Sequence, residues 1–206
     1  SVEPHLEEIT DGLGERFAVT ELAFKRYASC AFTHPGLDAL LSIMETHHLS
    51  YQQIQRMVLR FPKSGVALIN DDKLKSHSGR YVLAVGAYAK RVLIGDILQD
   101  RRAEPEIRRL HECIEVVGDE SIDSLFPAQY TTIIEVTTTD GRQFSERVDY
   151  ARGCPENPMT RDELSAKYFT LTEPEVGRKR AEGIRDWVDN LETVEDISAL
   201  GDLLHR

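Results

Sequence analysis

Two spacings of apolar residues alternate along this chain, and each predicts a different kind of element. Apolar positions between residues 35 and 46 recur every three or four residues, and Pro35 suits the first turn of a helix. A longer, largely buried helix is predicted over residues 78–95, with Gly95 at its C-cap. Residues 105–111 can add one or two further turns.

Runs rich in β-branched residues predict strands between these helices. Residues 54–61 form a short run that Pro62 ends, with Arg56 and Arg60 facing solvent or an anion. Residues 112–117 resemble a second strand.

The clearest local signal is a hairpin in the second half of the chain. Residues 131–139 are rich in β-branched side chains, Asp140-Gly141 is a dipeptide typical of a tight turn, and residues 142–150 form the returning strand. Helices flanking a small, largely antiparallel sheet predict an α+β fold.

The C-terminal region reads as helical. After a Gly/Pro-rich stretch at 153–158, Thr160 and Glu163 form a capping-box pattern, and the helical pattern continues to the end with an interruption near Thr193.

Because no linker or repeat appears, residues 1–206 are predicted to form a single α+β domain. We divide it into a lead-in segment (1–20), a core (21–170) and C-terminal helices (171–206).

Composition excludes several classes of protein. The 206 residues are 41% hydrophobic and 29% charged, which is typical of a globular chain large enough to bury a core. A net charge of -10 is unfavourable for docking on nucleic acid or an anionic membrane surface, so neither is expected as a partner. Three widely spaced cysteines fit a reducing compartment, and we expect a cytoplasmic protein.

Two clusters of reactive side chains could carry chemistry. The first, within residues 25–38, contains Lys25 and His34, which could bind a carboxylate and move a proton. The alternative is a solvated lysine and a histidine near a helix start.

The second cluster precedes and enters the apolar helix, where free N–H groups, hydroxyls and cations could bind an anion. Its candidate substrate-binding residues are Lys75, His77, Ser78 and Arg80. In the alternative, Ser78 is an ordinary N-cap and Tyr81 a core aromatic residue with a satisfied hydroxyl.

No metal site is predicted. His47 and His48 are adjacent and cannot both face one ion from a regular helix. The sequence also has no Gly-rich phosphate loop, nucleophile elbow or His-Glu-x-x-His motif.

Three blocks in order resemble the C-terminal domain of the MmgE/PrpD family. They are KRYASC at 25–30 with THPGLDA at 33–39, KSHSGRYVLAV at 75–85, and DGR at 140–142 with ARGCPENPMTRDELSAKY at 151–168. One departure is Gly79-Arg80, where the family usually has Leu-Pro.

The resemblance implies a lyase of the hydratase or dehydratase type that acts on a small carboxylate or related carbonyl compound, with no cofactor. It implies catalytic roles for Lys25, as a carboxylate anchor or oxyanion stabiliser, and for Tyr81, as a hydrogen-bond donor or proton relay in the same cleft. His34 and Ser78 occupy neighbouring motif positions.

Family chains usually carry a large all-helical N-terminal domain ahead of these blocks. The resemblance therefore implies either a fragment or one subunit of a split enzyme, whose site is completed by an all-helical partner subunit and whose complex forms a homodimer. A non-catalytic binding or scaffolding subunit is the alternative, and a standalone enzyme is a third possibility.

Overall fold

The computed structural model describes residues 9–71 and 73–204, so the first eight residues of the predicted lead-in lie outside the described residues. The chain divides into two compact units, Ser1–Pro158 and Met159–Arg206, which we describe separately. The sequence pattern predicts one domain, with C-terminal helices that begin at residue 171.

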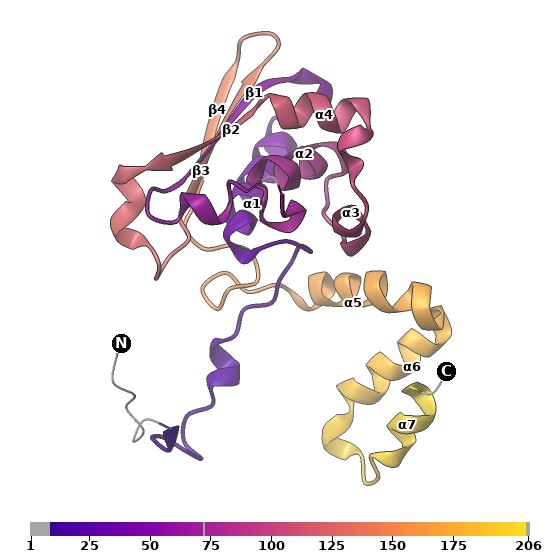
Figure 1. Ribbon diagram of the computed structural model, residues 1–206. Coiled ribbons are helices and arrows are strands. Elements are labelled where there is room, and N and C mark those ends of the chain that lie inside the picture. The colour runs from indigo at the N-terminus through magenta and orange to yellow at the C-terminus, as the bar shows by residue number, and fades with distance from the viewer. Residues whose placement is uncertain (1–8, 72, 205–206) are drawn as a thin grey trace. The chain divides into compact units, whose positions relative to one another are not determined.

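The first unit builds a four-stranded sheet with helices (Figure 1). In chain order its elements are α1 (His34–Thr46), β1 (Ile54–Pro62), α2 (Gly79–Ala89), α3 (Ile94–Leu98), α4 (Pro105–Glu112), β2 (Ile114–Asp119), β3 (Thr132–Thr138) and β4 (Gln143–Val148). The strand order is β2-β1-β3-β4, with β1 parallel to β2 and the other two pairs antiparallel. The predicted α+β class is confirmed.

The predicted hairpin is present between β3 and β4. Val136 pairs with Phe144 in the antiparallel register, and Gly141 in the turn has a φ of 83°, which favours glycine.

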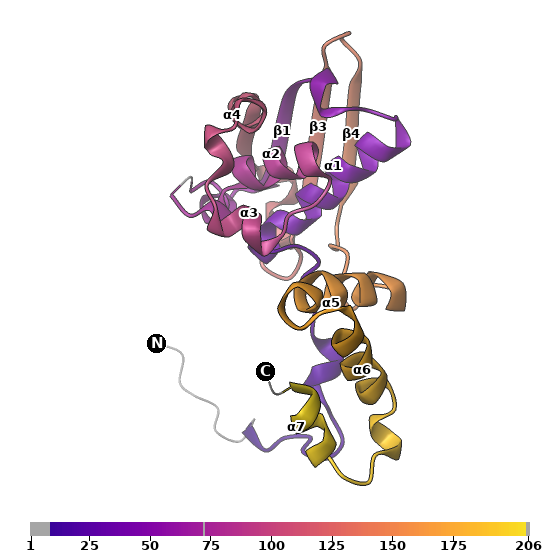
Figure 2. The same cartoon turned by 90° about the vertical axis from the view of Figure 1, so that its right-hand side faces the viewer.

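Helices α1 and α2 pack on the same face of the sheet (Figure 2). Leu59 of β1 reaches both, because a Cβ atom added at Gly36 of α1 would lie 2.8 Å from its Cδ1, and one added at Gly79 of α2 would lie 2.6 Å from its Cδ2. These two glycines therefore allow the helices to approach the sheet closely. The largest fully buried side chains of the core between them include Leu37, Leu40, Ile43, Met57, Phe61 and Tyr81.

The predicted helix over residues 78–95 is shorter than expected. It ends at Ala89, because Lys90 adopts the left-handed conformation with a φ of 56°. Val92 is nevertheless buried, but from a loop, and Gly95 lies inside the separate short helix α3. The apolar pattern continues past the helix because tertiary packing buries Val92.

The other face of the sheet carries charge pairs. Arg56 lies 2.6 Å from a carboxylate oxygen of Glu115, and Arg60 lies 2.7 Å from one of Glu135. The anions that these arginines face are therefore carboxylates of neighbouring strands.

The second unit contains α5 (Arg161–Val176), α6 (Arg178–Asp189) and α7 (Ser198–Leu204). The Thr160 and Glu163 capping box is confirmed, and the interruption near Thr193 is a 3-10 turn. An additional break occurs at Gly177, whose φ is 78°. Among the described residues of this unit only Ala181 is buried, so the unit has almost no core of its own.

Candidate active site

Residues 24–30, which carry Lys25, have no regular secondary structure and are held by backbone hydrogen bonds to distant segments. These bonds run from Phe24 N–H to Gly153 O (2.9 Å), from Ala28 N–H to Val92 O (3.1 Å) and from Cys30 N–H to Ser76 O (2.8 Å). Ser76 lies between Lys75 and His77 of the second reactive cluster. The structure therefore brings the backbones of the two clusters together.

Lys25 is exposed at the surface of the first unit. Its ammonium donates to the backbone oxygen of Ser29 at 3.2 Å. An ammonium has three N–H donors, so this group can bind a carboxylate at the surface while keeping that bond.

Asp38 of α1 holds the Lys25 segment through hydrogen bonds. Its Oδ1 accepts the Tyr27 hydroxyl at 2.6 Å and lies 3.4 Å from the Arg26 guanidinium, and its Oδ2 accepts the Arg152 backbone N–H at 2.7 Å. Burial raises the pKa of this carboxyl above its ordinary value, and this effect outweighs the lowering of the pKa by these partners.

His34 begins α1 and is almost fully buried. Its ring meets the Tyr27 ring edge-on, with 5.2 Å between the centroids. The imidazole thus lies inside the unit, whereas the Lys25 ammonium is at its surface.

Ser78 caps α2, as the structural alternative expects. Its hydroxyl accepts the Tyr81 N–H at 3.2 Å and is buried. The other predicted substrate-binding residues, Lys75, His77 and Arg80, are half-buried. Lys75 donates to the Leu98 backbone oxygen at 3.3 Å, and the Nδ1 of His77 lies 3.0 Å from the Ser76 hydroxyl. Arg80 is in the first turn of α2.

Tyr81 is fully buried, with its hydroxyl inside the unit. The hydroxyl donates its one proton to the backbone oxygen of Asp96 (2.5 Å) and accepts the Arg101 N–H (3.2 Å), and the backbone oxygen of Gln99 lies 3.1 Å from it. Burial raises the pKa of the phenol. In this arrangement Tyr81 fastens residues 96–101 to α2 and does not share an exposed surface with Lys25.

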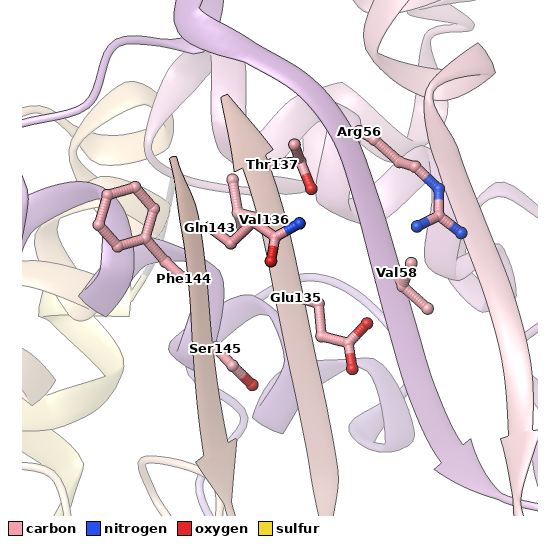
Figure 3. A pocket seen from close by; sticks show the side chains of 8 residues that line it. All are labelled: Arg56, Val58, Glu135, Val136, Thr137, Gln143, Phe144 and Ser145. Carbon is pink, nitrogen blue, oxygen red and sulfur yellow. The ribbon is translucent and has the colours of Figure 1, made fainter. Parts of the chain in front are cut away.

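The cavities that described residues of the first unit line include the following two. One, of about 340 Å³, is a depression on the charged face of the sheet, lined by residues of β1, β3 and β4 (Figure 3). The other, of about 500 Å³, is lined by residues from 20–23, 128–130 and 149–156. Neither is lined by Lys25 or Tyr81.

The described residues, 9–71 and 73–204, contain neither a cluster of metal ligands nor a membrane-spanning helix. No group of three or more His, Cys, Asp and Glu side chains in these ranges is arranged to hold a metal ion. No helix in the same ranges is both long and apolar enough to cross a bilayer.

Sequence reasoning assigned no role to Asp38 or to its partner Arg152. Both residues lie in the blocks that resemble the family. The sequence could not predict their hydrogen bond, because no local pattern reports a contact between residues so far apart in the chain.

Comparison with known proteins identifies the family. The family model described as MmgE/PrpD C-terminal domain matches residues 27–193. Cis-aconitate decarboxylase from Homo sapiens is 27% identical over 194 residues, which are 89% of this chain and 40% of that protein. The enzymes of the same name from Mus musculus and Aspergillus terreus are 25% and 24% identical, over 89% and 97% of this chain and 39% and 44% of their own lengths. The chain thus spans less than half the length of these curated relatives, and it belongs to the MmgE/PrpD family through its C-terminal domain.

Proposed function

We propose that this chain is one part of a cofactor-independent lyase, of the hydratase or dehydratase type, that acts on a small carboxylate or related carbonyl compound. An all-helical N-terminal domain or partner subunit completes the site. The observation that carries the proposal is the exposed Lys25 ammonium on a segment fixed by three long-range hydrogen bonds. The curated relatives, which are decarboxylases, add support for the lyase class.

In this proposal Lys25 is the residue that touches substrate. Its positive charge binds a carboxylate and stabilises negative charge that develops next to it when a bond breaks. A fixed backbone lowers the cost of positioning that charge. The buried His34 and Tyr81 support the surface from inside, His34 against Tyr27 and Tyr81 against residues 96–101.

The second candidate is a scaffolding subunit without chemistry of its own. The observation that favours it is the burial of Ser78 and Tyr81, whose hydroxyls have structural partners. In that case Lys25 is a surface lysine.

Turnover by the assembled complex separates the two. We would co-express the chain with the products of the neighbouring reading frames, purify the complex and assay it on cis-aconitate and other tricarboxylates. Lys25→Ala should lower turnover at least tenfold, or about 1.4 kcal/mol, while Lys63→Ala, an exposed lysine paired with Glu120, should leave it unchanged. Turnover within threefold of the parent for Lys25→Ala would favour the scaffold, and full activity of the lone chain would exclude the need for a partner.

A further inference from the structure

Strand β4 is an edge of the four-stranded sheet, and its outer side pairs with no other strand of the described residues (Figure 1). Proteins commonly guard such an edge with a lysine, a proline or a β-bulge, because unpaired backbone groups can join a further strand. β4 contains no lysine or proline, and its register with β3 is unbroken. Its one arginine, Arg147, is already neutralised by Asp149 at 2.7 Å. The edge is therefore open to another strand.

The hydrogen bonds of the β3–β4 hairpin determine which backbone groups face outward. The Thr138 N–H donates to the Arg142 oxygen at 2.9 Å, so the even-numbered residues of β4 direct their N–H and C=O groups toward β3. The N–H and C=O groups of Gln143, Ser145 and Arg147 consequently point away from the sheet. No hydrogen bond within the described part of the chain uses these outward groups.

The outward groups are complementary to a second copy of themselves. We infer that β4 pairs in antiparallel fashion with β4 of a second copy, about a two-fold axis at Ser145. In this register Gln143 faces Arg147 of the second copy and Ser145 faces its own counterpart, so every outward N–H and C=O group gains a partner. The inference does not rest on the proposed function, since none of these residues belongs to the two reactive clusters.

The side chains on the open face of the sheet fit this register. The Arg147 Nε and Nη2 atoms lie 2.9 and 2.7 Å from Asp149 Oδ1, and Nη1 can donate to the side-chain oxygen of Gln143 in the second copy. Gln143 and Ser145 line the depression of about 340 Å³ together with Glu135 (Figure 3). Arg147 of the second copy would therefore stand at the rim of this depression.

The opposite face of β4 favours a second copy over an unrelated strand. Glu146 makes no ion pair with any described residue, and in the proposed register it faces Phe144 of the second copy. The Phe144 ring is stacked on the His47 imidazole, with 4.2 Å between the centroids. An imidazole N–H can donate to the arriving carboxylate, and the two-fold axis repeats this contact on the other side.

The oligomeric state of the full chain tests the inference. A short strand edge buries little surface, so we expect a reversible dimer with a dissociation constant in the micromolar range. Sedimentation velocity over about a hundredfold range of protein concentration should show exchange between monomer and dimer. Ser145→Lys places like charges face to face at the axis and should weaken the dimer at least about tenfold. Ser145→Ala, which keeps the backbone N–H and a small side chain, is the matched control and should dimerise like the parent.

Ser145 is exposed and its backbone does not bond β3, so both variants should keep the parent's circular dichroism spectrum and, in dilute solution, its melting temperature. Amide hydrogen exchange then reads the register. The N–H groups of Gln143, Ser145 and Arg147 should be protected at high protein concentration and lose this protection on dilution. Those of Phe144 and Glu146, which bond β3, should stay protected at both concentrations.

Three results would each overturn the inference. The first is a chain that remains monomeric at about 200 µM, far above the expected dissociation constant. The second is a dimer that Ser145→Lys does not weaken, because another surface would then form it. The third is exchange at the Ser145 amide that does not change with protein concentration.

Discussion

Replacing Asp38 with asparagine tests how the Lys25 segment is held. The Oδ1 atom of Asp38 accepts from the Tyr27 hydroxyl and from the Arg26 guanidinium, and its Oδ2 accepts from the Arg152 backbone N–H. An asparagine has one acceptor oxygen, so one of these donors loses its acceptor and faces an amide NH2. A buried donor left unsatisfied costs about 1–3 kcal/mol. The neutral carboxyl also offers a second acceptor, its hydroxyl oxygen, which asparagine lacks, so we expect Asp38→Asn to lower the free energy of unfolding by about that amount at pH 4.

The cost should depend on pH in a defined direction. Because burial raises the pKa of Asp38 above its ordinary 3.8, the folded state holds this proton more tightly than the unfolded state does. The stability contributed by Asp38 is therefore largest at low pH and decreases as the pH rises from 3.8 through the folded-state value. The difference between parent and Asp38→Asn should shrink from pH 4 to pH 7.

Urea unfolding of both proteins between pH 4 and pH 7 measures this difference. Asp140→Asn is an informative control, because hydrogen bonding, first from the Thr138 hydroxyl, lowers the pKa of Asp140. A lowered pKa gives the opposite sign, so the stability lost in Asp140→Asn should grow as the pH rises. If the Asp38 difference also grows with pH, then its hydrogen bonds and Arg26 dominate over burial, and our account of this carboxyl is wrong.

Two further substitutions test packing and capping. In Gly86→Ala the new Cβ would overlap Cδ1 of the fully buried Leu37, so overpacking of about 1–3 kcal/mol should outweigh the gain of up to about 1 kcal/mol in helix propensity. Gly95→Ala, with nothing within 4 Å of the new Cβ, should instead stabilise the protein. Thermal unfolding of the two variants measures the difference, and equal melting temperatures would contradict the packing at Gly86. Thr160→Ala removes the cap that accepts the Glu163 N–H and should lower the local stability of α5 by about 1 kcal/mol. The loss should appear as faster amide hydrogen exchange at the start of α5, and unchanged exchange there would show that the cap contributes little.

Local patterns predicted the elements whose causes are local. The β3–β4 hairpin followed from β-branched runs on either side of Asp140-Gly141, and the start of α5 followed from the spacing of Thr160 and Glu163. Each depends on residues within a few positions of one another, so the sequence reports them directly.

Features that depend on long-range contacts could not be predicted in this way. The parallel pairing of β2 with β1 and the burial of Val92 from a loop both arise from packing between distant segments. The same holds for the site: Lys25 and Tyr81 were assigned together from a family resemblance, but only the structure shows one exposed and the other enclosed by residues 96–101. The burial of a hydroxyl is set by the segment that folds over it.

The bond between Phe24 and Gly153 can form only late in the synthesis of the chain. Lys25 leaves the ribosome long before Gly153, the last residue to bond its segment, since Gly153 follows the last strand of the sheet. Contacts between such distant positions form late in folding because a long loop must close first. A nascent chain stopped before residue 150 would therefore contain the lysine and the partners of Ala28 and Cys30, but it would lack the bond that holds Phe24 directly ahead of the lysine.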